Sequence, residues 1–332
     1  MCHKLDAGAN QNAIIFTAEP DRSHARVNTQ APALPVGGMM AINYLALKNR
    51  QFDDVRHSYG AKDSMLYALG IGLGADPQDL DQLRFVYEKD LLAVPTMAAV
   101  LGCPGFWVRA PDTGLDWQNI LHVAQELTLH QALRPCGEVV GKTAVEALVD
   151  KRSAGALLTT RRDVCDAATG ELVAVSRAVM LCRSNGNFGG GDPAGPSAQQ
   201  VSERMLTGPN DRPDIICVLP SYVQSALIYR LSGDDNPLHA DIRVAQRAGF
   251  ERPILHGLCT FGMAGHAALR TLCAYDPARL KKLKLRFSSP FYPGETLKTS
   301  FWKVAQGRAA FQCHSVEREV MVINHGVVEY LE

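Results

Sequence analysis

The residues best able to do chemistry lie in one stretch, Tyr229-Arg-Leu-Ser-Gly-Asp-Asp-Asn-Pro-Leu-His239. This stretch is rich in turn formers, which predict a tight irregular loop: Ser232, Gly233, Asp235, Asn236 and Pro237. Asp234 and His239 are five residues apart, a spacing that would place them on different faces of an uninterrupted helix. On a folded loop both side chains can instead point to one place.

A carboxylate and an imidazole that face one water molecule form a capable acid–base pair. Groups of this kind typically contribute about 10² to 10⁴ in rate. Asn236 lies between Asp234 and His239 and could orient the carboxylate or the water through its amide. The alternative is an ordinary turn that caps a helix, because His239 to Ala248 is expected to be helical and to end at Gly249.

A second segment, Pro253-Ile-Leu-His256-Gly257, stands directly before a long apolar helix. Gly257 would place a backbone N–H without side-chain bulk at the helix N-terminus, where unpaired amides and the helix dipole favour a negative oxygen. An oxyanion donor of this kind contributes roughly 2.7–4 kcal/mol in a transition state. The alternatives are a glycine that only lets the chain turn and a His256 that serves as a core or capping residue.

The elements that must position these residues are easiest to predict in the C-terminal part, residues 213–332. A long helix is expected at Gly257 to Cys273, wrapped on more than one side because its other positions are mostly small. Strands are expected at 283–287, 296–304 and 309–316, and a further pair, 319–323 and 327–331, around the turn Asn324-His325-Gly326. A helix followed by antiparallel strands predicts an α+β unit in which one sheet curls around one buried helix.

The N-terminal part, residues 41–185, is predicted as a second unit. Its expected elements are a short helix at Asp63 to Gly72, capped by Asp63, and strands at 139–149, 156–164 and 172–182. The turn at 166–170 would join the last two strands as a hairpin. Residues 1–40 are predicted to be a poorly ordered polar extension, and residues 186–212, rich in glycine and proline, a linker between the two units.

Composition narrows the possible functions of the 332-residue chain. Lys+Arg and Asp+Glu are equal at 34 each, which gives no support for a nucleic-acid or membrane partner. The nine cysteines are odd in number and contain no Cys-x-x-Cys, so reduced thiols in a cytoplasmic compartment are expected rather than disulfides or structural zinc. Gly70 to Gly74 is a poor nucleotide-loop candidate, because it follows a helical stretch and lacks the third glycine in register.

Together the two chemical segments resemble the hydratase 2 family within the wider MaoC-like dehydratase group. The resemblance is carried by 229–239, by Ala248-Gly-Phe250, by Arg252-Pro-Ile-Leu-His-Gly-Leu258 and by Arg286-Phe-Ser-Ser-Pro-Phe-Tyr-Pro-Gly-Glu-Thr296. The N-terminal unit is also similar, through Tyr67-Ala-Leu-Gly-Ile-Gly-Leu-Gly-Ala-Asp-Pro77, Leu83-Arg-Phe-Val-Tyr-Glu88 and Leu92-Ala-Val-Pro-Thr-Met97. The resemblance as a whole covers about residues 41–332.

The resemblance implies a double hot-dog fold, with two antiparallel sheets side by side and each associated with a helix. It implies reversible syn hydration of a trans-2-enoyl-CoA to the (3R)-3-hydroxyacyl-CoA, as in fatty-acid β-oxidation, with the N-terminal unit making room for the acyl chain. By motif position Asp234 and His239 would be the catalytic pair, Asn236 would help to hold the water, and the Gly257 N–H would bind the thioester oxygen. It implies no metal and no redox cofactor, an acyl-CoA substrate and a homodimer.

Two segments depart from the family pattern. The chain has His122-Val-Ala-Gln125 where the family often has His-Gly-Glu-Gln, and Arg183-Ser-Asn-Gly-Asn-Phe-Gly-Gly190 where a more glycine-rich run is common. We assign no site role to His122. Two other functions stay open: an acyl-CoA thioesterase on the same fold, and an acyl-CoA-binding protein without catalysis.

Overall fold

The computed structural model describes residues 42–193 and 212–332, all within one compact unit that spans 39–332. The predicted polar extension, 1–40, and positions 194–211 of the predicted linker lie outside the described residues. Among the helices of the described ranges, none is long and apolar enough to cross a lipid bilayer.

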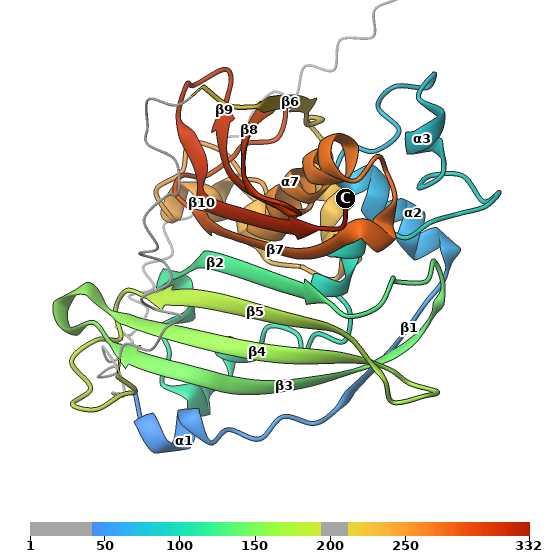
Figure 1. Cartoon of the computed structure of the whole chain (residues 1–332). Helices are drawn as coiled ribbons and strands as arrows, with labels where there is room; N and C mark the ends of the chain where they lie inside the picture. Colours follow the sequence, from blue (N-terminus) through green and yellow to red (C-terminus); the bar gives the residue numbers. More distant parts are fainter. Residues whose placement is uncertain (1–41, 194–211) are drawn as a thin grey trace, which may run out of the picture. The chain divides into compact units, whose positions relative to one another are not determined.

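Ten strands form one sheet whose neighbours all pair antiparallel, in the order β1-β3-β4-β5-β2-β7-β10-β9-β8-β6 (Figure 1). The N-terminal half supplies β1 (Val55–Tyr59), β2 (Ile120–Leu129), β3 (Gly137–Asp150), β4 (Ala156–Asp166) and β5 (Leu172–Cys182). The C-terminal half supplies β6 (Ile215–Pro220), β7 (Leu280–Phe287), β8 (Thr296–Ala305), β9 (Arg308–Ser315) and β10 (Met321–Tyr330).

The strand order repeats between the halves. In each half the strands lie in the order first, third, fourth, fifth, second, and the two second strands, β2 and β7, pair with each other. Their register runs from Ala124↔Arg286 to Thr128↔Lys282. The predicted α+β double hot-dog architecture is therefore confirmed, and hydrogen bonds across this seam join the two sheets into one.

The helices differ between the halves. The N-terminal half has α1 (Tyr44–Lys48), α2 (Ala61–Gly70) and α3 (Leu80–Leu83), and the C-terminal half has α5 (Ser225–Tyr229), α6 (Ile242–Arg247) and α7 (Gly257–Leu272). Single 3₁₀ turns complete the described chain: η1 (Pro95–Ala99), η2 (Trp107–Arg109), η3 (Pro111–Thr113), η4 (Trp117–Asn119), η5 (Arg152–Ala154), η7 (Arg230–Ser232), η8 (Pro237–His239) and η9 (Pro277–Arg279).

The long helix α7 is enclosed on several sides by both halves. A β carbon at Gly262 would lie 2.6 Å from Ile71 Cγ2 of the segment after α2, and one at Gly265 would lie 2.5 Å from Thr96 Cγ2 of η1. Larger side chains at these positions would overpack the core. The prediction of a buried helix wrapped on more than one side is confirmed, and its small residues are explained by this close approach.

Most predicted elements are present, with shifts of a few residues at their ends. The strand at 172–182 has the predicted bounds, and the hairpin turn at 166–170 joins β4 to β5. The helix predicted at 63–72 is α2, and its cap differs from the prediction. Gly60 is its N-cap, and Asp63 Oδ2 accepts from the Gly60 N–H at 2.8 Å. The predicted helix from His239 to Ala248 is divided into η8 and α6.

Among the predicted strands, one pair is wrong, and three strands of the structure were missed. Residues 319–323 and 327–331 do not form a hairpin, because β10 runs through them as one strand. At Asn324-His325-Gly326 the register of β10 shifts against both of its neighbours, β7 and β9, and His325 has a φ of 51°. Strands β1, β2 and β6 were not predicted.

Candidate active site

The loop that carries Asp234 is shaped by its own side chains. Gly233, in the left-handed conformation at φ 108°, ends η7 and turns the chain. Asp234 Oδ1 then accepts from the Asn236 N–H at 3.2 Å, and Asn236 Oδ1 accepts from the Leu238 N–H at 3.1 Å. These side-chain-to-backbone turns, followed by Pro237 at the start of η8, fold the loop as the turn formers predicted.

Two imidazoles tie this loop to the segment before α7. His239 Nδ1 lies 2.9 Å from the Ile254 carbonyl oxygen, so the Nδ1–H donates and Nε2 carries the lone pair. His256 Nε2 lies 3.3 Å from the Asp234 carbonyl oxygen and donates in the opposite direction. The two rings lie nearly face to face, with centroids 3.8 Å apart and planes at 32°.

The structure brings the acid–base candidates together. One polar side-chain atom from each of Asp234, His239 and His256 lies within 4.8 Å of the other two. His239 is 8% exposed and His256 is fully buried. Because His256 is the N-cap of α7, the Asp234–His239 pair also lies beside the start of that helix. A water molecule between carboxylate and imidazole would be within reach of both.

Burial keeps both imidazoles neutral. The pKa of His239 is lowered from its ordinary value of 6.5, mainly by desolvation, although the nearby Asp234 carboxylate opposes this shift. Burial lowers the pKa of His256 to about 2, helped by the charge that His239 would carry. At neutral pH His239 Nε2 therefore offers a lone pair to a proton, as a general base requires.

Gly257 is the first residue of α7, where the backbone N–H groups have no partner inside the helix. The positive end of the 16-residue helix dipole adds to their attraction for a negative oxygen. A β carbon on Gly257 would lie 3.4 Å from Phe287 Cζ, which is van der Waals contact. The glycine leaves the space beside this amide free of side-chain atoms, and its backbone is not in the left-handed region.

Asn236 has a more local role than expected. Its Oδ1 is occupied by the Leu238 N–H, which makes Asn236 the N-cap of η8. The Nδ2 group of the amide can still donate to a water molecule.

His122, to which the sequence analysis assigns no site role, comes close to the site. The pairing of β2 with β5 has an irregularity between His122 and Ala124. Such bulges re-aim a side chain. The His122 ring packs edge-on against Phe287 with centroids 5.1 Å apart, and its Nε2 donates to the Ala124 carbonyl at 2.9 Å. Desolvation lowers the pKa of His122, and the Asp234 carboxylate opposes this shift. The His-x-x-Gln pattern alone does not reveal this bulge.

Two imidazoles and one carboxylate are also ligand types of a divalent metal site. An imidazole lone pair lies in the plane of its ring. The hydrogen bonds of His239 Nδ1 to the Ile254 carbonyl and of His256 Nε2 to the Asp234 carbonyl leave His239 Nε2 and His256 Nδ1 as the lone-pair nitrogens. The same Asp234–His239 arrangement can work as an acid–base pair without a metal.

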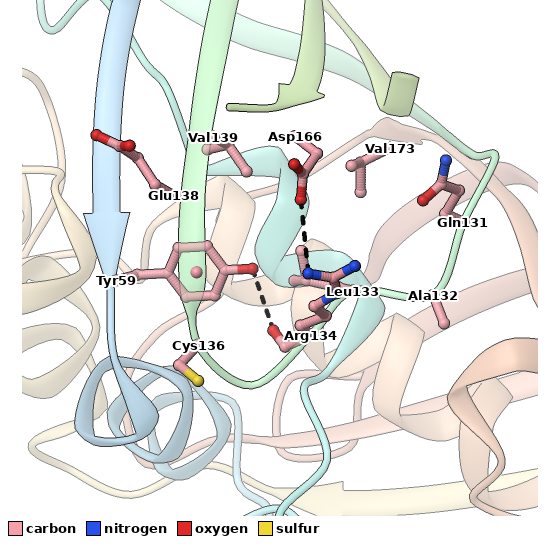
Figure 2. Close-up of a pocket in the computed structure, with 11 residues that line it drawn as sticks. Tyr59, Gln131, Ala132, Leu133, Arg134, Cys136, Glu138, Val139, Asp166 and Val173 are labelled. Carbon is pink, nitrogen blue, oxygen red and sulfur yellow. Dashed lines mark hydrogen bonds and ion pairs between the residues drawn. The ribbon is translucent and has the colours of Figure 1, made fainter. Parts of the chain in front are cut away.

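A separate small pocket lies in the N-terminal half, at the ends of β1 and β3 (Figure 2). In it Tyr59 OH donates to the Arg134 carbonyl at 3.1 Å, and Arg134 Nη1 lies 3.9 Å from Asp166 Oδ2. Cys136 lines the same pocket. None of Asp234, His239 or Gly257 lines it, so it is not part of the candidate site.

Comparisons with known proteins match both halves of the chain. A family described as "MaoC like domain" matches residues 199–325, and one described as "MFE-2 hydratase 2 N-terminal domain" matches residues 57–184. The chain is 37% identical over 281 residues to "3-hydroxyacyl-thioester dehydratase Y" of Mycobacterium tuberculosis, covering 81% of this chain and 92% of that protein.

Two further similarities agree with this match. The chain is 35% identical over 282 residues to "Enoyl-CoA hydratase 2, peroxisomal" of Arabidopsis thaliana, covering 81% of this chain and 90% of the relative. A crystal structure described as a "MaoC-like dehydratase from Phytophthora Capsici" superposes with a TM-score of 0.74 at 31% identity. It covers 86% of this chain and 98% of the other.

Proposed function

Because this chain belongs to the hydratase 2 family of MaoC-like dehydratases, we propose that it reversibly adds water to a trans-2-enoyl-CoA and forms the (3R)-3-hydroxyacyl-CoA. Relatives named enoyl-CoA hydratase 2 support an enzyme with hydratase activity. The observation that carries the proposal is the Asp234–His239 pair, within 4.8 Å of each other beside the first amide of α7.

In this proposal a water molecule lies between the Asp234 carboxylate and His239 Nε2. As the water oxygen bonds to carbon 3, His239 Nε2 takes one of its protons, because burial keeps the imidazole neutral and Nδ1–H is held by Ile254. The Asp234 carboxylate orients the water and stabilises the imidazolium that forms. The pair then returns the proton to carbon 2 on the same face, which gives syn addition.

The thioester oxygen needs a separate partner during this step, because attack at carbon 3 moves negative charge onto it. The Gly257 N–H at the start of α7 would supply that partner, with the helix dipole behind it. His256 would keep the two catalytic segments at a fixed separation through its bond to the Asp234 carbonyl.

The test is a panel of trans-2-enoyl-CoA thioesters of increasing chain length, incubated with the purified protein. We expect loss of the conjugated enoyl-thioester absorbance and a (3R)-3-hydroxyacyl-CoA product by chiral chromatography. A (3S) product, or no hydration of any substrate in the panel, would contradict the proposal. Release of free thiol without hydration would instead identify a thioesterase, and binding without turnover a non-catalytic acyl-CoA-binding protein.

A further inference from the structure

We propose that the Glu295–Arg318 ion pair positions both catalytic segments, so that its loss slows turnover more than it weakens substrate binding. The two segments are 221–239, which carries the acid–base pair, and 252–257, which ends on the oxyanion amide. The inference rests on the proposed function and assigns this pair a positioning role in the same site.

The ion pair is buried at its carboxylate end. Glu295 precedes β8 and is 3% exposed, whereas Arg318 lies in the turn between β9 and β10 with a half-buried side chain that is 31% exposed. Arg318 donates from Nη2 to Glu295 Oε2 at 2.9 Å and from Nε to Glu295 Oε1. Such two-point guanidinium–carboxylate pairs fix geometry as well as adding energy. The Glu295 hydrogen bonds also raise the pKa of Arg318.

From this pair a first route leads to the oxyanion segment through the backbone of the 290–295 turn. Glu295 Oε2 accepts from the Tyr292 N–H at 3.1 Å, and Arg318 Nη2 donates to the Pro290 carbonyl at 2.6 Å. Between these two anchored residues, the Phe291 carbonyl accepts from the Leu255 N–H at 2.7 Å. Leu255 is two residues before Gly257. The ion pair therefore holds in place the turn to which the oxyanion segment is hydrogen-bonded.

A second route uses side chains. The Tyr292 ring lies under two guanidinium groups, with Arg318 Cζ 4.9 Å and Arg252 Cζ 4.7 Å from its centroid. Arg252 also donates from Nη1 to the Pro293 carbonyl at 3.0 Å. Because Arg252 begins the oxyanion segment, this stack attaches the start of the segment to the same turn.

The main chain of Glu295 reaches the other catalytic segment. Its carbonyl oxygen accepts from the Ser221 N–H at 2.9 Å and from Ser221 Oγ at 2.7 Å. Ser221 Oγ in turn accepts from the Gly294 N–H at 3.0 Å. Ser221 opens the segment that continues through α5 to Asp234, so Glu295 is connected to both parts of the site.

A displacement of about 1 Å in a catalytic group can cost roughly 10² in rate even when the change lies outside the chemistry. Loosening the 290–295 turn would displace the Gly257 amide relative to the Asp234–His239 pair. We therefore expect the charge-neutralising variant Glu295→Gln to lower kcat by about 10-fold to 10² and to leave KM within about twofold.

The matched control is Glu146→Gln in the N-terminal half. Glu146 of β3 accepts from Arg177 Nε of β5 at 3.0 Å, and both residues lie outside the two catalytic segments. The steady-state kinetics of the two variants and of Arg318→Lys are measured with one enoyl-CoA, together with urea unfolding. Hydrogen exchange in the segment 253–258, measured at the amides of Ile254 to Leu258, gives a readout that does not depend on activity.

The proposal predicts a fall in kcat and faster exchange at 253–258 in Glu295→Gln, a partial fall in Arg318→Lys, and neither in Glu146→Gln. A kcat in Glu295→Gln within about twofold of wild type would overturn it. The proposal would also be overturned if both variants, Glu295→Gln and Glu146→Gln, lost kcat only in proportion to their loss of unfolding free energy. If the wild-type protein hydrates no substrate but exchange at 253–258 still increases in Glu295→Gln, the anchoring stands and the proposed function fails.

Discussion

The two halves of the sheet have the same strand order, but the chain between their first and second strands differs. Between β6 and β7 it forms α5, the Asp234 loop and the 16-residue helix α7. Between β1 and β2 it forms α2, α3 and the 3₁₀ turns η1 to η4. The same topology therefore carries a long helix with a reactive loop in one half and neither in the other.

The contrast is chemical as well as geometric. The loop after α2 has an aspartate turn like that of Asp234, because Asp76 Oδ1 accepts from the Gln78 N–H at 2.9 Å, but Asp76 is exposed and faces no histidine. The turn η1 opens with Pro95, which has no N–H to offer an oxyanion. Within residues 42–193, the turn after α2 thus has no Asp–His pair, and η1 does not open with an amide like that of Gly257.

What the N-terminal half retains is packing. The Tyr67 ring of α2 lies 5.8 Å from the Tyr229 ring of α5, and Tyr229 in turn lies 5.2 Å from the His256 ring. Thr96 of η1 and Ile71 contact the small residues of α7. One helix therefore serves the core of both halves, and the N-terminal half supports a site to which it gives no acid–base group.

The largest effect is expected from His239→Gln. Glutamine keeps an N–H for the Ile254 carbonyl but has no lone pair of suitable basicity, so the rate should fall by about 10² to 10⁴. The measurement is kcat for enoyl-CoA hydration at neutral pH. Replacing His57, a histidine of β1 in the other half, with Gln should leave kcat unchanged. Equal losses in both variants would break the contrast between the halves.

The next effect is expected from Gly257→Ala. The added methyl group would lie in van der Waals contact with Phe287 Cζ at 3.4 Å and would occupy space beside the first amide of α7, where the thioester oxygen would bind. A donor lost completely would cost roughly 2.7–4 kcal/mol, and a thioester oxygen held away from the amide should lower kcat by about 10-fold or more. Kinetics beside a circular-dichroism melt check this. Unchanged kcat with an intact fold would remove the Gly257 amide from the mechanism.

A pH dependence follows from the lowered pKa of His239. The neutral imidazole is the active base, and it becomes protonated as pH falls through a pKa that lies below 6.5. The value of kcat/KM should therefore be level near neutrality and fall about tenfold for each pH unit below that pKa. A pH–rate profile of wild type tests this. An acidic limb centred above 6.5 would contradict a buried, neutral His239.

The smallest effect concerns the shared helix. Gly265→Ala would force a β carbon to 2.5 Å from Thr96 Cγ2, so the free energy of unfolding should fall by about 1–3 kcal/mol. Urea unfolding measures this. Gly190→Ala is the control, because Gly190 is not in the left-handed backbone region and the nearest atoms to its β carbon, in the Tyr44 side chain, would be 3.9 Å away. A Gly265→Ala protein as stable as wild type would show that α7 is not held tightly against the N-terminal half.

Local patterns made part of this structure predictable. The strand-like run at 172–182, which follows the turn at 166–170, marked β5, and the small, apolar sequence after Gly257 marked α7. The turn formers before His239 predicted the folded loop, because their side chains bond to backbone groups only two residues away.

What could not be predicted depends on distant partners. The bonds from His239 to Ile254 and from His256 to Asp234 join residues 15 and 22 positions apart, and no local pattern reveals them. The edge strands β1 and β6 are short, and the alternation of β2 is interrupted at the His122 bulge. In β10, Asn324-His325-Gly326 has the composition of a hairpin turn, but pairing with two neighbours keeps the strand continuous.

The most direct test compares two neutral replacements of similarly turned aspartates, Asp234→Asn and Asp76→Asn, in the hydration of one trans-2-enoyl-CoA. We predict that Asp234→Asn loses about 10² to 10⁴ of kcat while its unfolding curve stays close to that of wild type, and that Asp76→Asn keeps full activity. Full activity in a folded Asp234→Asn protein would show that the chemistry does not depend on the C-terminal loop.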